Sequence, residues 1–305
     1  MNPLKQSAFS LPKHLADGIW KKAETGSTIA VLSGAEPMLF GQTQVMKFTQ
    51  RPKAQFVGES ENKSAADTNF GTVTIEPHKV QVTVRHSKEV QWADEDYQLG
   101  VLAELSSAMG VALSRALDLG VYHAINPHSG DALSGSPGKV YDTGNSVSVT
   151  DDADSDVEQA VGLVISDGFT PNAIALDPSY AWVLATARYE DGRKIYPDLG
   201  FGTDITSFQG LRAAVSTTVS APEGAVSGGV YETENPNIRA FVGDFEQIRW
   251  GVQRQIGVEK LTAGDPDGTG DLNRRNEIAL RGEVVFGWAV MDTDAFAVIE
   301  GESGS

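Results

Sequence analysis

The 305-residue sequence predicts an α+β fold, in which strand-rich regions at both ends enclose a long helix and one α/β unit. Three observations support this prediction. Two strand-patterned regions near the N-terminus are joined by a polar linker, apolar residues recur at three- and four-residue steps between residues 94 and 125, and alternating strands fill the chain after Gly210. With 40% hydrophobic residues the chain can bury a core, so disorder is not predicted.

The first strand region runs from about Thr43 to Val57 and the second from Phe70 to Val84. The linker between them, Gly58–Asn69, is polar and too long for a tight turn, which predicts an extended hairpin arm. In the second region the apolar residues change face around Pro77. Because proline cannot donate to a strand ladder, we expect a bulge or bend there.

One long helix is predicted from about Asp94 to Ile125. Acidic residues at 94–96 suit its N-terminus, and Asn126-Pro127 ends it. Its apolar stripe consists of Leu102, Leu105, Met109, Leu113, Ala116, Leu117, Gly120 and Val121. A helix of this length is a structural spine rather than an ordinary domain helix.

A glycine- and aspartate-rich connection, 130–152, contains one possible strand at Ser146–Val149 and leads to an α/β unit. Ser155 and Glu158 form a capping box that predicts a second helix, which ends near Asp167-Gly168. A short strand, Ala173–Leu176, precedes a third helix over Ser179–Tyr189, capped by Asp177-Pro178. Later strands are predicted at Leu211–Val215, Arg239–Val242, Ile248–Val252, Ile278–Phe286 and Phe296–Ile299.

Composition and charge exclude several function classes. Without cysteine the chain has no disulfide, thiol nucleophile or thiolate metal site. A net charge of −17 argues against a conventional DNA-reading module. The first 22 residues differ, because Lys5, Lys13, Lys21 and Lys22 face only one aspartate. This basic arm suits contact with a polyanion, although lysines that merely solubilise a loose terminus explain it equally well.

No catalytic, cofactor-binding or metal-binding residue is assigned, and no cofactor is expected. The aspartates 151, 152, 154 and 156 suit a helix start as well as a divalent ion, and the segment Asp265–Asp271 suits a turn better than a calcium loop. His123 and His128 flank a helix end, where the helix dipole accounts for them. Gly135–Lys139 lacks the first glycine and the hydroxyl residue of a phosphate-binding loop. No apolar stretch is long enough to span a membrane, since Gly287 interrupts the segment Val284–Met291.

Three stretches resemble the Hong Kong 97 family of bacteriophage major capsid proteins. FVGESENKSAADTNFGTVTIEPHKVQVTVRHSKEV is similar to the family's extended loop and the strand that follows it. TPNAIALDPSYAWVLATARYEDGRKIY is similar to its axial-domain strand, capped helix and Asp-Gly-Arg turn. RNEIALRGEVVFGWAVMDTDAFAVI is similar to its terminal strands. In order and spacing the resemblance covers nearly the whole chain after Gly26.

The resemblance implies a fold with an N-terminal arm (1–42), an extended β-hairpin loop (43–84), a peripheral domain with the spine helix (85–150), an axial α/β domain (151–234) and a return to peripheral strands (235–305). It implies hexamers and pentamers that close into an icosahedral head around double-stranded DNA, in a virion assembled in the bacterial cytoplasm. The expected assembly contacts are Arg51, Lys53, Glu59, Glu61, Lys63, Lys79 and Trp20. Lys5, Lys13, Lys21 and Lys22 would face the DNA, without sequence-specific contacts.

The expected partners are further copies of the chain, a portal and a decoration protein. A separate scaffolding protein is expected too, since many family members carry a long scaffolding segment where only about 25 residues stand here. Some family members join a loop lysine to a neighbour's asparagine; Lys63 is the tip lysine here, but we expect non-covalent pairing. Two alternatives remain open at this point. An encapsulin-like shell would share the fold and enclose enzymes, whereas a metal-dependent enzyme would use the aspartates near Asp151 or Asp265.

Overall fold

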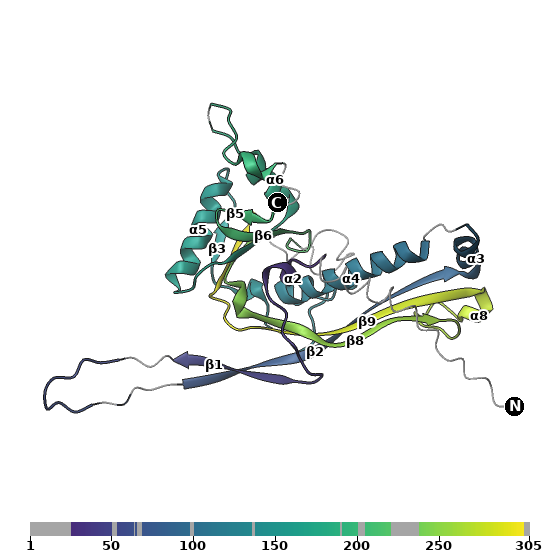
Figure 1. Cartoon of the computed structure of the whole chain (residues 1–305), viewed down its shortest axis with the longest axis horizontal. Helices are drawn as coiled ribbons and strands as arrows, with labels where there is room; N and C mark the ends of the chain where they lie inside the picture. The colour runs from purple at the N-terminus through teal and green to yellow at the C-terminus, as the bar shows by residue number, and fades with distance from the viewer. Residues whose placement is uncertain are drawn as a thin grey trace.

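The computed structural model describes residues 26–50, 54–63, 65, 69–97, 101–135, 138–189, 191–200, 205–220 and 238–301. Two sheets organise these residues (Figure 1). A four-stranded sheet has the order β1-β2-β9-β8, and a six-stranded sheet has the order β3-β10-β7-β4-β6-β5. The predicted mixture of helices and strands in an α+β fold is therefore confirmed.

The four-stranded sheet is built from unusually long strands. They are β1 (Thr43–Gln50), β2 (Asn69–Ser87), β9 (Glu277–Val290) and β8 (Ile248–Leu261). β1 and β2 form the predicted antiparallel hairpin, with Thr43 opposite Ile75. The predictions for the later strands are confirmed in position, but β8 and β9 extend well beyond them.

The bulge predicted at Pro77 is wrong. β2 continues through Pro77, and its pairing with β9 runs without a register shift from Glu76 opposite Trp288 to Ser87 opposite Glu277. The change of apolar face instead marks a change of partner: residues up to Ile75 pair with β1, and residues from Glu76 onward pair with β9. A proline fits where only one neighbouring strand continues the ladder.

The single helix predicted from Asp94 to Ile125 is also corrected. Two helices occupy this region, α3 (Lys88–Tyr97) and α4 (Val101–His123). α3 follows β2 directly, because the Lys88 amide donates to the carbonyl of Asn276 at 3.0 Å and starts the helix there. Figure 1 shows α4 lying across the four-stranded sheet, with α3 at its far end. The spine is therefore α4 alone, and it ends at the expected place, with Ala124 in the left-handed region at φ 54°.

The six-stranded sheet contains the α/β unit. Its strands are β3 (Ser146–Ser148), β10 (Phe296–Glu300), β7 (Ile238–Gly243), β4 (Ala173–Leu176), β6 (Leu211–Val215) and β5 (Ser207–Phe208). α5 (Ala153–Ser166) and α6 (Pro178–Thr186) pack against it. Asp177 caps α6 as predicted, but α5 begins earlier than its capping box suggested, since Asp152 accepts from the Ser155 amide. β7 and β10 pair in this sheet, so residues 235–305 contribute to both sheets.

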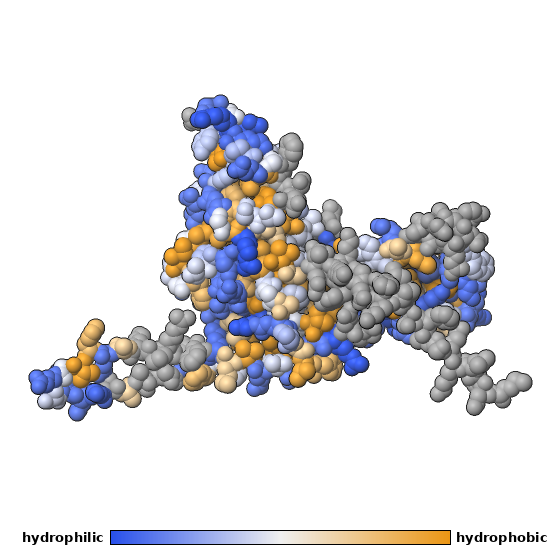
Figure 2. Space-filling model, viewed as in Figure 1, coloured by the Kyte–Doolittle hydropathy of each residue, from blue (hydrophilic) through white to orange (hydrophobic). Residues whose placement is uncertain are grey.

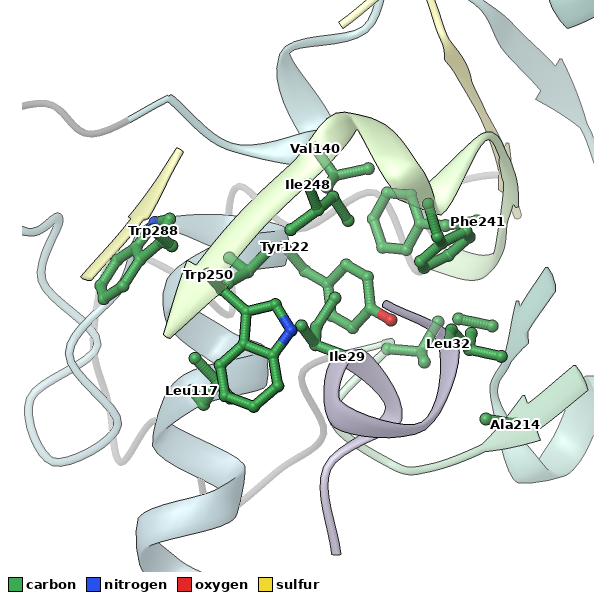
Figure 3. Packing of buried hydrophobic residues seen from close by; sticks show 14 of the residues in the cluster. Ile29, Leu32, Leu117, Tyr122, Val140, Ala214, Phe241, Ile248, Trp250 and Trp288 are labelled. Carbon is green, nitrogen blue, oxygen red and sulfur yellow. The ribbon is translucent and has the colours of Figure 1, made fainter. Parts of the chain in front are cut away.

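Short elements connect these layers. They are α2 (Thr28–Leu32), α8 (Leu272–Arg275) and three 3-10 turns at Val140–Asp142, Pro197–Leu199 and Phe245–Gln247. The main core lies where α2 and α4 meet the strands (Figure 3). There Tyr122 stacks on Phe241, with ring centres 4.9 Å apart. Among the described residues, no helix is both long enough and apolar enough to cross a membrane.

Candidate assembly surfaces

The β1–β2 hairpin projects away from the rest of the chain (Figures 1 and 2). Large apolar side chains on it face solvent: Phe56 is fully exposed, Met46 is 75% exposed and Phe70 is 55% exposed. Leu39 and Phe40, which lead into β1, are 87% and 64% exposed. Several large apolar side chains exposed on one projecting hairpin favour an interaction site over an ordinary monomer surface.

Residues 58–61 at the tip of the hairpin form a hydrogen-bonded turn that presents charge. The amide of Glu61 donates to the carbonyl of Gly58 at 3.2 Å, and the Gly58 amide donates to the Glu61 carboxylate at 2.8 Å. Glu59, Glu61 and Lys63, all expected assembly contacts, are exposed here. Two acidic side chains and one lysine are therefore exposed within seven residues of Phe56 in the sequence, at the end of the hairpin.

A segment before β1 fixes the base of the hairpin. The Glu36 amide donates to the carbonyl of Trp250 in β8 at 2.8 Å, and the Trp250 indole donates to the carbonyl of Ser33 at 3.2 Å. Further along, the Gln253 side chain both accepts from the Gly41 amide and donates to the Gly41 carbonyl, each at 3.1 Å. The segment thus lies along the edge of β8 and sets the direction in which the β1–β2 hairpin leaves the sheet.

Two lysines of the hairpin strands make ion pairs within the chain. Lys79, an expected assembly contact, pairs with Glu283 on β9 at 2.8 Å and keeps 57% of its side chain exposed. Lys47 pairs with Asp292 at 2.6 Å. The other expected contacts, Arg51, Lys53 and Trp20, and the arm lysines Lys5, Lys13, Lys21 and Lys22, lie outside the described residues.

A buried carboxylate that sequence reasoning missed joins three distant segments. Asp118 of α4 is fully buried and accepts from the amides of Thr28 and Ile29, at 3.0 and 3.2 Å. It also accepts from the hydroxyl groups of Ser27, Thr28 and, at 2.7 Å, Thr218. Burial raises the pKa of Asp118, and these hydrogen bonds oppose the rise. An aspartate within the apolar half of the predicted helix was the signal available in the sequence.

The helix-dipole explanation of His123 is wrong. Its ring is buried, and Nε2 lies 3.2 Å from the carbonyl oxygen of Thr218 and 3.0 Å from that of Val219, so this nitrogen donates. Burial lowers the pKa of His123 to about 4. The histidine is therefore neutral at physiological pH and carries no charge for a dipole to stabilise.

The acidic loop at residues 265–271 holds a guanidinium group. Arg85 of β2 donates to Asp267, to Glu277 at 2.8 Å, to the carbonyl of Gly270 at 3.0 Å, and to Asp265 at 3.5 Å. Arg85 holds the pKa of Asp267 at about 2. The predicted turn is confirmed, and its carboxylates are used to fasten the loop to β2.

The aspartates at the start of α5 also have structural partners. Asp152 caps the helix, buried Asp156 accepts from the amide and hydroxyl of Thr150, and Asp154 accepts from the Tyr196 hydroxyl. Among the residues that the structure describes, no group of three or more acidic or histidine side chains is arranged to hold a metal ion. The carboxylates that raised the metal-enzyme alternative are explained by local hydrogen bonds.

This architecture, in which a projecting hairpin carries large exposed apolar side chains beside two sheets and a spine helix, points to a structural protein that binds further chains. The model of the phage capsid family matches residues 7–301. The probable major capsid protein gp17 of Mycobacterium phage D29 is 23% identical over 291 residues, which span 91% of this chain and 86% of that protein. The chain belongs to the phage capsid family.

Solved structures agree with this assignment. One from Mycobacterium phage Ogopogo is 52% identical, with a TM-score of 0.84 over 90% of this chain and 92% of that one. Another, from Gordonia phage Cozz, is 32% identical, with a TM-score of 0.77 over 91% and 87%. The resemblance to Hong Kong 97 capsid proteins is confirmed. The chain is a bacteriophage major capsid protein, a structural subunit and not an enzyme, which self-assembles into the virion capsid. Neither the encapsulin nor the metal-enzyme alternative is favoured.

Proposed function

We propose that this capsid protein assembles through hexamers and pentamers into an icosahedral head around double-stranded DNA, and that the β1–β2 hairpin is the clamp between neighbouring subunits. The exposed apolar surface of the hairpin carries this proposal. Phe56, Met46 and Phe70 gain nothing from exposure to water, whereas burial against a neighbour would release about 25 cal/mol for each Å² covered.

The two sheets support a division of labour within the subunit. The four-stranded sheet with α4 would form the peripheral domain (85–150 with part of 235–305), and the six-stranded sheet with α5 and α6 would form the axial domain (151–234 completed by β7 and β10). Axial domains would meet at the centre of each capsomer. The hairpin (43–84), which belongs to the peripheral sheet, would reach across to a neighbour.

The charged residues divide into a group that would contact a neighbouring subunit and a group that would contact DNA. Glu59, Glu61 and Lys63 at the hairpin tip are exposed and available to a neighbour, and Lys79 retains enough exposure for a second contact beside Glu283. Arg51, Lys53 and Trp20 would add to this interface. Lys5, Lys13, Lys21 and Lys22 in the arm (1–42) would contact the packaged DNA through phosphates, without reading its sequence.

Deleting residues 58–69 tests the clamp. The β1–β2 ladder pairs Thr43–Gln50 with Asn69–Ile75, so most of it survives the deletion. We expect a folded subunit, with an unchanged circular dichroism spectrum and melting temperature, that fails to form closed shells in electron micrographs. A variant with a Gly/Ser segment of equal length in place of 58–69 controls for loop length. Shells from the deletion variant in wild-type yield would refute the proposed clamp.

A further inference from the structure

The β1–β2 hairpin leaves the body of the four-stranded sheet between Ile75 and Glu76 of β2. Up to Ile75 the strand pairs with β1, and from Glu76 onward it pairs with β9. Outside this junction, which we call the pivot, the hairpin is a two-stranded ribbon. Because a two-stranded ribbon is only marginally stable alone, its direction depends on contacts with the rest of the subunit.

Some of these contacts lie at the pivot itself. The Gln42 side chain donates to the Glu76 carboxylate at 3.0 Å, and Gln253 of β8 makes its two bonds with Gly41. Both contacts lie just before Thr43, where β1 begins opposite Ile75. They fix the position of the hairpin base, but so close to the pivot they resist a rotation of the hairpin only weakly.

An ion pair joins the hairpin to the body farther from the pivot. Lys47 of β1 lies 2.6 Å from Asp292, in the connection between β9 and β10, and the two side chains are 30% and 25% exposed. In the sheet order β2 separates β1 from β9, so no strand ladder links the two residues. The residue of β2 opposite Lys47 is Gly71, which has no side chain to obstruct the lysine. The Asp292 carboxylate also accepts from the Asp294 amide at 3.4 Å, which holds it in place.

The geometry makes this ion pair sensitive to the angle of the hairpin. Lys47 is four residues beyond Thr43, or about 13 Å along the strand, and extended chain places Phe56 about three times as far out. A rotation of about 10° at the pivot therefore moves Lys47 by about 2 Å and Phe56 by about 7 Å. A displacement of about 2 Å breaks an ion pair of 2.6 Å, so an intact pair confines the tip to a narrow range of positions.

We propose that Lys47 and Asp292 are positioning residues that set the angle at which the hairpin leaves the subunit, and hence where the hairpin tip meets a neighbouring copy. The angle is a property of the single subunit, whereas its effect on assembly rests on the proposed role of the hairpin as a clamp. A partly exposed ion pair shifts an equilibrium by up to about fivefold. The pair therefore favours one direction in the free subunit, and contacts with a neighbour can still adjust it.

Distances between two spin labels test the angle in unassembled subunits. The chain contains no cysteine, so labels attach only at Asn62→Cys near the hairpin tip and Glu158→Cys on α5, both exposed positions. α5 packs on the other sheet, so this distance reports the hairpin against the body of the subunit. In Lys47→Gln and in Asp292→Asn we expect the population at the wild-type distance, relative to all other distances, to fall by up to about fivefold. Unchanged distributions in both variants would overturn the inference.

Two further variants separate the ion pair from a general effect of substitution. Lys47→Arg keeps the charge and should keep the wild-type distribution, and the exchange K47D/D292K restores opposite charges and should recover it. Glu283→Gln is the matched control, because it removes the ion pair with Lys79 inside the β2–β9 region and should leave the distribution unchanged. An exchange variant as broad as Lys47→Gln, or a control that broadens equally, would count against the proposed role.

Electron micrographs of the same variants connect the angle to assembly. We expect Lys47→Gln to give fewer closed shells and a wider spread of diameters than wild type, and K47D/D292K to recover both. If deletion of 58–69 abolishes assembly while Lys47→Gln keeps the wild-type distances, the clamp stands and the positioning role fails. If Lys47→Gln loses the wild-type distance while the deletion variant still forms shells, the positioning role stands and the clamp fails.

Discussion

Replacing Asp118 with alanine should strongly destabilise the folded subunit, because this one carboxylate accepts hydrogen bonds from two distant segments and joins both to α4. The amides of Thr28 and Ile29, in the first turn of α2, have Asp118 as their acceptor and lie in a buried region. The hydroxyl groups suffer less, because Thr28 retains Tyr122 at 2.9 Å and Thr218 retains Ser216 at 2.8 Å.

The size of the expected loss in the free energy of unfolding follows from the two buried amides that would lose their acceptor. Each buried donor without an acceptor costs about 1–3 kcal/mol, and removing a buried carboxylate whose burial raises its pKa recovers part of that cost. We therefore expect a loss of about 2–5 kcal/mol for Asp118→Ala. Asp118→Asn keeps one acceptor oxygen and should lose about 1–3 kcal/mol.

Urea unfolding of unassembled subunits, followed by tryptophan fluorescence, measures these differences as shifts of the midpoint at constant slope. Asp131→Ala, at an exposed position, serves as the control and should change stability by less than about 0.5 kcal/mol. If Asp118→Ala matches the control, the hydrogen bonds do not hold the three segments together. A stabilising Asp118→Asn would show that the cost of burying the charge exceeds the value of its bonds.

Two further predictions concern the core around α4. At Gly120 an added Cβ would lie 2.9 Å from the Trp288 ring, so Gly120→Ala should lower the free energy of unfolding by about 1–2 kcal/mol. At Gly162 in α5 an added Cβ would meet nothing within 4 Å, so Gly162→Ala should raise the free energy of unfolding by up to about 1 kcal/mol in the same urea titration. Folding lowers the pKa of His123 from 6.5 to about 4, so as the pH falls the unfolded chain binds a proton at this histidine before the folded chain does. The folded state is therefore stabilised least at low pH: the free energy of unfolding that is present above pH 6.5 is lost as the pH falls toward 4. Wild type should lose about 2 kcal/mol more than His123→Gln between pH 7 and 5, and parallel pH profiles of the two would contradict a buried neutral ring.

Local patterns in the sequence predicted the elements well but not their partners. The strands β4, β6 and β10 and the capped helix α6 were found from short apolar runs and from Asp177-Pro178, which act within a few residues. The division between α3 and α4 was missed because the apolar period is compatible with one helix, and the contact that begins α3 comes from Asn276, far along the chain. The same limit explains the error at Pro77, where a change of strand partner resembled a bulge.

The candidate assembly surface was also predicted only in its local features. A polar tip with glutamates and a lysine between two strands was visible in the sequence, and the structure adds that Phe56, three residues before Glu59, is fully exposed. A surface that is completed by a second copy leaves no periodic signal in one chain, because both halves of the interface are exposed in the subunit alone. Large apolar side chains that stay exposed on a projecting hairpin are the physical feature that reveals it.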